Sequence, residues 1–245
     1  MAESASALGD LGFDPQGLVT SCRRLIAKHP TAGALWWMSA RLLTALDPRR
    51  EARACVNEIE GDPTPGELAF ALPEEATVVV VGWPDLVSQA LVRRGDVSVL
   101  VIDVHDEGRG LQRRLDRAEV MATVVPASGL GAAVAGCDLV ILEADALGPD
   151  AFLATSSSRA AAAVAYCAEI PVWVACGAGR ALPGQLWSAL CAAIDDDEPW
   201  DFDVEVVPLG LVSALAGSMG LIDPSELDIL VTAPVAPELL KEIPN

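Results

Sequence analysis

The stretch from Gly136 to Leu186, GCDLVILEADALGPDAFLATSSSRAAAAVAYCAEIPVWVACGAGRALPGQL, decides the fold of this chain. Two apolar runs, Leu139–Leu142 and Pro171–Ala175, are typical of buried strands, and the alanine-rich run Ala160–Ala168 between them is typical of a helix. A strand, a helix and a second strand over this length form the βαβ unit of a parallel sheet. We therefore predict an α/β fold with a parallel sheet and a right-handed crossover.

A ligand site is expected at the carboxyl ends of these strands, because the loops that lead into the following helices meet there. These loops carry two acids, a hydroxyl-rich segment, two glycines and two arginines. The residues are Glu143, Asp145, Thr155, Ser156, Ser157, Ser158, Arg159, Gly177, Gly179 and Arg180. The sequence predicts that any active or binding site lies among them.

The composition limits the class of protein. A chain of 245 residues buries roughly three quarters of its surface and needs no disulfide to fold. The hydrophobic fraction is 52%, yet no run approaches the roughly 18 apolar residues of a membrane span. The N-terminus shows no secretory signal, so we expect a cytoplasmic protein. The cysteines have no paired spacing and histidines are scarce, so we expect reduced thiols, no metal and no cofactor.

Negative charge is concentrated in the second part of the chain. Residues 1–117 hold 13 Lys and Arg against 17 Asp and Glu, whereas residues 118–245 hold 3 against 18. Such an acidic surface disfavours direct contact with nucleic acid. The three late cations are Arg159, Arg180 and Lys241. Because the first two fall in the strand-end loops, they predict an anion site; the alternative is that each pairs with a neighbouring carboxylate.

The N-terminal part is predicted to be helical, after a frayed start over residues 1–14. Helical spacing predicts a first helix over 15–28, a second capped by Thr31 and running to about residue 46, and a third opened by Asp47-Pro48 and ending near Gly61. The pair Trp36-Trp37 places aromatics on two adjacent faces, so one should pack on the α/β domain or on another subunit. The turn-rich linker 62–66 separates a helical domain, 1–66, from an α/β domain, 67–245.

The α/β domain is expected to alternate strands and helices around the central unit. We predict strands over 76–81, 97–103 and 122–125, and helices over 86–94, 111–117 and 128–135. After the central unit we predict a helix over 184–193, a solvated acidic loop over 195–198, a last strand over 202–207 and a short helix over 211–219.

The first strand ends in Gly82-Trp83-Pro84-Asp85, where nucleotide-binding folds carry a glycine-rich phosphate loop. Neither GxGxxG nor GxxxxGK[ST] is present, so the phosphate fingerprints of dinucleotide and P-loop enzymes are absent. Asp85 is instead expected to cap the following helix. The pair Gly177 and Gly179 is too short to specify a nucleotide.

The segment Thr155–Ser158 opens the alanine-rich helix, and we expect one of its hydroxyls to cap that helix. The alternative is that these hydroxyls, the free amides and Arg159 together bind a phosphate or carboxylate. Asp145 can serve as a general acid or base, or simply as a turn residue. We find no Ser-His-Asp or Cys-His set, because His29 lies in the helical part and His105 has no nucleophile expected beside it.

Several segments, taken in order, resemble one known family. They are VVVVGWPDLVSQALVRRGDVSVLVIDVHDEGRGLQRRLDRAEVMATVVPASGL, DLVILEADAL, the serine-rich helix start, EIPVWVACG and FDVEVVPLGLVSALAGSMGLID, preceded by HPTAGALW from His29. Their order and spacing over residues 15–225 are similar to those of the eukaryotic translation initiation factor 2B regulatory subunits. That family also includes methylthioribose-1-phosphate isomerase and ribose-1,5-bisphosphate isomerase.

The resemblance implies a Rossmann-like sheet with helices on both faces behind a helical N-terminal domain, assembly into dimers or larger oligomers, and a sugar-phosphate or nucleotide pocket. The isomerases of the family use an aspartate, matched by Asp145, and a cysteine, whose position falls at about Gly82. Glu143 stands where that aspartate motif has glycine, and would oppose a phosphate. Two elements that follow the aspartate in the family, Asn-Gly-Asp and Asn-Lys, are replaced here by Gly148-Pro149-Asp150 and Thr155-Ser156.

The sequence is interpreted as a catalytically degenerate, isomerase-like member of this family: an acidic, cytoplasmic homodimer or higher oligomer. It is expected to bind a phosphorylated small molecule or a protein partner, with no direct nucleic-acid or membrane partner. One alternative is an active sugar-phosphate isomerase using Asp145; another is a structural oligomer subunit whose pocket is filled by a Glu143–Arg159 pair. The predicted ligand-binding residues are Gly82, Trp83, Glu143, Thr155, Ser156, Ser157, Ser158, Arg159, Gly177 and Arg180.

Overall fold

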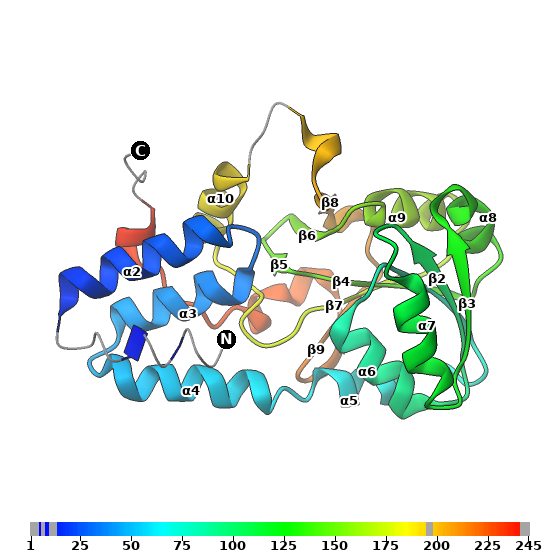
Figure 1. The fold of residues 1–245 in the computed structure, drawn as a ribbon, viewed down its shortest axis with the longest axis horizontal. Coiled ribbons are helices and arrows are strands. Elements are labelled where there is room, and N and C mark those ends of the chain that lie inside the picture. The colour runs from blue at the N-terminus through cyan, green and yellow to red at the C-terminus, as the bar shows by residue number, and fades with distance from the viewer. Residues whose placement is uncertain (1–4, 6–7, 10–13, 195–197, 241–245) are drawn as a thin grey trace.

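A computed structural model describes residues 5, 8–9, 14–194 and 198–240. Its main feature is a seven-stranded sheet of order β10-β9-β7-β4-β1-β2-β3. Every neighbouring pair in this sheet is parallel except β9 and β10. Helices cover both faces (Figure 1), so the predicted Rossmann-like α/β architecture is confirmed.

The central βαβ unit forms as predicted. Strands β4 (Leu139–Glu143) and β7 (Val172–Ala175) pair in parallel, and helix α9 (Ser158–Cys167) lies between them in the chain. The strands are almost fully buried because they lie in the middle of the sheet, which explains why their sequences are apolar without alternation.

The remaining predicted elements before the central unit are also present, each within a few residues of its expected range. They are β1 (Thr77–Val81), α6 (Asp85–Arg94), β2 (Ser98–Asp103), α7 (Gly108–Asp116), β3 (Met121–Pro126), the 3-10 turn Ala127–Gly129 and α8 (Leu130–Ala135). Side chains of α8 and α9 pack on one face of the sheet, and those of α5, α6 and α7 on the other.

A second, three-stranded antiparallel sheet was not expected. It consists of β5 (Ala146–Leu147), β6 (Ala151–Thr155) and β8 (Val204–Pro208), in that order. The first two strands lie inside the central unit, in a stretch that we had predicted as loop. The strand predicted over 202–207 exists as β8, but it belongs to this small sheet, because its partner β6 folds back across the end of the large one.

The helix predicted over 211–219 is wrong. That segment forms the hairpin β9 (Ala214–Gly217) and β10 (Gly220–Ile222), which completes the large sheet beside β7. Leu215 and Ala216 are fully buried there. Burial in the sheet outweighs the helical propensity of this alanine- and leucine-rich segment.

The N-terminal region contains α2 (Pro15–Lys28), α3 (Gly33–Thr44), α4 (Pro48–Glu60) and α5 (Thr64–Ala71). Asp47 caps α4 as predicted, because its Oδ1 accepts a hydrogen bond from the Arg50 amide at 3.1 Å. Thr31 does not cap α3: that helix follows Ala32 and has no side-chain cap. The domain boundary expected at residue 66 falls within α5 and stays a prediction.

The helical region is joined to the sheets by a shared core. Trp36 and Trp37 are both buried, and the Trp37 indole donates to Thr232 Oγ1 at 2.9 Å. A Cβ on Gly179 would lie only 2.7 Å from the Trp37 ring. The expectation that one of these aromatics packs on the α/β domain is therefore confirmed, and the loop after β7 is held against α3.

The C-terminal part contains α10 (Gly184–Ala193), close to its predicted range, and short 3-10 turns. The turns span Pro199–Asp201, Leu209–Leu211, Pro224–Leu230 and Pro237–Leu239. Most of the predicted acidic loop 195–198, most of the expected frayed start, and Lys241 lie outside the described residues. Within the described part, no helix is long and apolar enough to cross a membrane.

Candidate functional site

A small cavity opens at the carboxyl ends of the strands, where the sequence predicted a site. Its volume is about 220 Å³, below the range of typical small-molecule pockets. Four carboxylates and one cation line it: Asp85, Glu107, Glu143, Asp145 and Arg180. The surroundings are therefore acidic, which disfavours binding of a phosphate.

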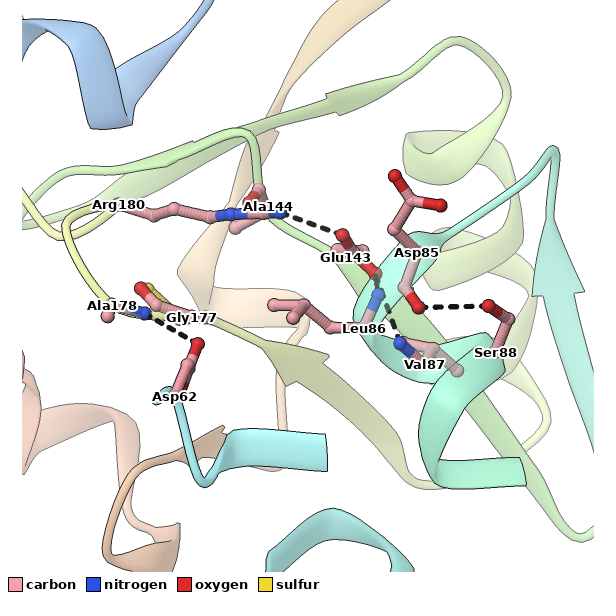
Figure 2. A network of polar contacts seen from close by, with 11 residues as sticks. Asp62, Asp85, Leu86, Val87, Ser88, Glu143, Ala144, Gly177, Ala178 and Arg180 are labelled. Carbon is pink, nitrogen blue, oxygen red and sulfur yellow. Dashed lines mark hydrogen bonds and ion pairs between the residues drawn. The ribbon is translucent and has the colours of Figure 1, made fainter. Parts of the chain in front are cut away.

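Glu143, at the end of β4, occupies the N-terminus of α6 (Figure 2). Its Oε2 accepts hydrogen bonds from the amides of Leu86 at 2.8 Å and Val87 at 3.1 Å. These are the free amides that bind phosphate in nucleotide-binding folds. The expectation that Asp85 caps this helix is wrong, because Asp85 is its first helical residue and Pro84 precedes it without a side-chain cap.

Arg180 holds the second oxygen of the same carboxylate. Its guanidinium donates to Glu143 Oε1 at 2.8 Å and to the carbonyl of Ala144 at 2.7 Å. The Glu143 side chain is only 9% exposed and that of Arg180 21%. Burial alone would lower the pKa of Arg180, but the carboxylate of Glu143 raises it above its ordinary value. Arg180 therefore stays charged within this hydrogen-bonded pair.

The loop that carries Arg180 is fixed at a second point. Asp62 Oδ2 accepts a hydrogen bond from the Ala178 amide at 2.9 Å, and its other oxygen accepts from the Thr64 amide at the start of α5. A Cβ on Gly177 would collide with Asp62 Oδ2 at 2.6 Å. Gly177 is thus explained by packing rather than by ligand contact.

Asp145 lies beside this pair without taking part in it. Burial raises the pKa of its carboxyl to about 6, Arg180 lowers it and Glu143 raises it further. Its backbone is fixed, because its amide donates to Leu153 and its carbonyl accepts from Gly33 at the start of α3. The acid–base role of Asp145 stays a prediction, and its raised pKa is compatible with that role.

The hydroxyl-rich turn before α9 does not cap that helix. Ser157 occupies the cap position in the left-handed region, with φ of 74°, and makes no side-chain cap hydrogen bond. The Arg159 amide is instead bound by Glu205 Oε1 at 2.9 Å. Ser158 is buried, and Thr155 and Ser158 both line the 220 Å³ cavity.

The two arginines do not form one anion site. Arg159 lines a separate cavity of about 510 Å³, together with Trp200, Phe202 and other residues of the β8 region. Arg180 lines the strand-end cavity. The predicted Glu143–Arg159 pair is also wrong: Glu143 pairs with Arg180, whose loop follows the neighbouring strand β7.

Gly82 and Trp83 both lie at the strand-end turn, as predicted. Gly82 has φ of 64°, a left-handed conformation that favours glycine. Trp83 lines the cavity and covers α7, where a Cβ on Gly110 would lie 2.4 Å from its ring. Gly82 itself is not among the residues that line the cavity, so its predicted role in ligand binding stays a prediction.

One contact contradicts the sequence interpretation directly. His105, in the loop after β2, has a nucleophile beside it: Ser156 Oγ lies 3.3 Å from His105 Nε2. His105 Nδ1 lies 3.6 Å from Asp203 Oδ1. These residues are 51 and 98 positions from His105 in the chain, and they meet only because β8 pairs with β6. Without that unpredicted sheet, no sequence signal could bring them together.

Comparison with known proteins identifies the fold. The sequence matches no protein-family model and no curated protein. Eukaryotic initiation factor eIF2B beta from Chaetomium thermophilum superposes with a TM-score of 0.73 at 18% identity, over 94% of this chain and 82% of that one. The initiation factor eIF-2B of Pyrococcus horikoshii OT3 gives 0.74 at 13% identity, over 91% and 90%.

A third solved structure is the tetrameric eIF2B-beta2-delta2 complex from C. thermophilum. One of its chains superposes with a TM-score of 0.73 at 18% identity, over 94% of this chain and 86% of that one. The chain therefore has the fold of these initiation-factor subunits across most of its length. This structural similarity confirms the expected fold without relying on the sequence segments that suggested it.

Proposed function

We propose that the chain is an eIF2B-like, non-isomerase subunit that acts through assembly with other protein chains. The observation that carries this proposal is the position of Glu143. Its carboxylate fills the α6 N-terminus and neutralises Arg180, so the groups that would bind a phosphate are satisfied within the chain itself. Of the roles considered from sequence, this favours the structural subunit over the binder of a phosphorylated metabolite.

The isomerase alternative is disfavoured by the same site. Gly82 supplies no thiol, and the buried Cys176 has a pKa raised by burial to about 12, which disfavours the reactive thiolate. Asp145 is the remaining candidate acid or base. A phosphate would also need to displace Glu143 and approach three further carboxylates in a cavity of about 220 Å³.

An exposed apolar edge supports the assembly role. Strand β10 is the last strand of the large sheet, and α5 packs beside it. On these elements and the turn between β9 and β10, Phe70 is 89% exposed, Met219 60% and Leu221 37%. Exposed apolar residues at an open sheet edge are typical of a protein interface. We propose a second copy of this chain as the occupant, in keeping with the oligomeric eIF2B-beta2-delta2 complex.

The oligomer is tested by sedimentation velocity on the wild type and on Phe70→Asp. The wild type should sediment as a dimer or larger species, and the variant should shift towards monomer because a charge at the interface is costly to desolvate. Tyr166→Asp is the matched control, since Tyr166 is also exposed (64%) but lies on α9. A monomeric wild type, or equal shifts in both variants, would contradict this interface.

The filled anion site is tested by thermal shift with inorganic phosphate and sugar phosphates. Wild type should not respond, whereas Glu143→Gly exposes the α6 amides and Arg180 and should be stabilised by phosphate through binding to the native state. Glu143→Gln, which keeps a hydrogen-bond acceptor, is the control and should respond weakly. A clear shift of wild type, or sugar-phosphate turnover lost in Asp145→Asn, would overturn the proposal in favour of the metabolite-binding or isomerase alternative.

A further inference from the structure

We infer that Ser156, His105 and Asp203 form a second, separate site, adjacent in the chain to Thr155 and Ser158 of the strand-end cavity: a serine nucleophile able to cleave small acyl esters. The inference rests on the distances among the three side chains and on the way the fold fixes them. It is independent of the assembly role, which depends on a different surface.

The three side chains are placed as a nucleophile (Ser156), a general base (His105) and a residue that orients the base (Asp203). With its proton on Nδ1, His105 presents an unprotonated Nε2, to which the Ser156 hydroxyl donates at 3.3 Å. Asp203 Oδ1, 3.6 Å from Nδ1, favours this tautomer by attracting the Nδ1 proton. His105 is therefore placed to remove the proton of Ser156, with Asp203 as its positioning residue.

Backbone contacts fix Ser156 and the backbone of Asp203, whose side chain is 89% exposed. The Ser156 amide donates to the Asp203 carbonyl at 2.8 Å, which extends the pairing of β6 with β8. The loop of His105 is held where Asp103 Oδ1 accepts from the Gly108 amide at 3.0 Å. The His105 side chain is 29% exposed, so the base is reachable from solvent while most of its surface is packed.

The turn after Ser156 has the form expected of a presented nucleophile. Ser156 follows strand β6 and precedes helix α9, and the intervening Ser157 has a φ of 74° that is unfavourable for a residue other than glycine. Strain of this kind is concentrated at functional sites. The amides of Ser157 and Ser158, which open α9, are the candidate donors to a developing oxyanion.

The surroundings limit the substrate. The neighbouring residues Thr155 and Ser158 line the cavity of about 220 Å³, which is below the size of typical small-molecule pockets and favours a small acyl group. Asp203, Glu205 and the acids of the cavity repel anions. The site is thus suited to esters of a small acid with a neutral or cationic alcohol.

The reaction balances with water as the only co-reactant. Ser156 Oγ bonds to the carbonyl carbon while its proton moves to His105 Nε2. The bond from carbon to the alcohol oxygen then breaks, and the alcohol takes that proton. Water next gives a proton to His105 and attacks the acyl carbon, and Ser156 regains its proton as the carboxylic acid leaves.

The experiment combines covalent labelling with turnover. Wild type should form a single adduct with a fluorophosphonate probe, located on Ser156 by peptide mass spectrometry, and should hydrolyse p-nitrophenyl acetate. Ser156→Ala should abolish both, and His105→Ala should slow labelling on the order of 100-fold, the lower end of general-base catalysis. Ser188→Ala is the control, because its exposed hydroxyl bonds within α10 and should not affect either reaction.

A structural role for the same contacts gives a different result. If the three residues only connect the loop after β2 to the small sheet, Ser156→Ala and His105→Ala should lower the melting temperature while wild type shows no adduct. That outcome, or an adduct at another serine, would overturn the inference. Circular dichroism of each variant separates loss of reactivity from loss of fold.

Discussion

The two strand-to-helix turns that contribute residues to the strand-end cavity differ in how the amides at the start of the helix are hydrogen-bonded. The turn from β1 to α6 contributes Trp83, Pro84 and Asp85 to the cavity, and the turn from β6 to α9 contributes Thr155 and Ser158. At α6 a buried carboxylate accepts two amides and is neutralised by an arginine. At α9 a more exposed carboxylate, from Glu205, accepts one amide, and Ser156 remains directed at His105.

This difference teaches that burial, rather than the helix terminus itself, decides whether such a turn can act on a ligand. The free amides and dipole of the first turn attract an anion at any helix. Where the anion is internal and desolvated, as with Glu143, an external anion must break an existing buried ion pair before it can bind. Where the internal partner is at the surface, the turn stays accessible for chemistry.

The largest effect is expected from Glu143→Ala. This change removes the acceptor of two amides and leaves the buried Arg180 guanidinium without an anionic partner, so the free energy of unfolding should fall by about 4 kcal/mol. Urea denaturation followed by circular dichroism measures it. The matched change at the other turn is Glu205→Ala, which removes one solvent-accessible cap acceptor and should cost only about 1 kcal/mol. Equal losses at the two turns would break the comparison.

The large sheet could be predicted because the local sequence of its strands already indicates buried β-structure. The runs that became β1, β2, β4 and β7 are apolar except at their ends, as expected for strands buried on both faces. Proline and glycine mark most helix ends, and Asp47-Pro48 located the start of α4 to the residue. These signals depend only on neighbours in the chain.

The small sheet and the pairings in the site depend on neighbours in space. Ala146–Leu147 and Ala151–Thr155 are too short and too rich in alanine to indicate strands, and Ala214–Gly217 has the composition of a helix. Glu143 was identified as an acid in the site, but its partner depends on the loop of Arg180, whose conformation follows from Gly179 against Trp37. The contact of Ser156 with His105 was missed for the same reason, since it follows from the pairing of β6 with β8.

A second, smaller effect is expected from Asp145→Asn, and it depends on pH. The pKa of Asp145 is raised from 3.8 to about 6 in the folded chain, so between these values the native state binds more protons than the unfolded state. Its stability therefore falls as the pH rises through this window, and the cost is fully present above it. Asp145→Asn should stabilise the chain by about 3 kcal/mol at pH 8 and hardly at all at pH 4.

Urea denaturation at the two pH values measures this difference. The mutation sharpens the comparison, because burial disfavours the charged form of Asp145, whereas the carboxylate of Glu143 is hydrogen-bonded to two amides and an arginine. A stabilisation of Asp145→Asn that is equal at pH 4 and pH 8 would contradict the raised pKa.

The smallest effects are expected from the backbone of the two turns, and they have opposite signs. Gly82 and Ser157 both have left-handed φ values, 64° and 74°, but only the first of these positions is occupied by glycine, which adopts such values without strain. Gly82→Ala should lower the free energy of unfolding by about 1 kcal/mol, and since its Cβ would lie 3.5 Å from Thr155, the cost comes from backbone conformation rather than collision.

Ser157→Gly should leave stability unchanged or raise it by less than about 1 kcal/mol, because relief of strain is offset by greater freedom of the unfolded chain. Both changes are measured by thermal and urea denaturation. A clear loss of stability in Ser157→Gly would show that the turn before α9 is held by its side chain, and the two turns would then be alike.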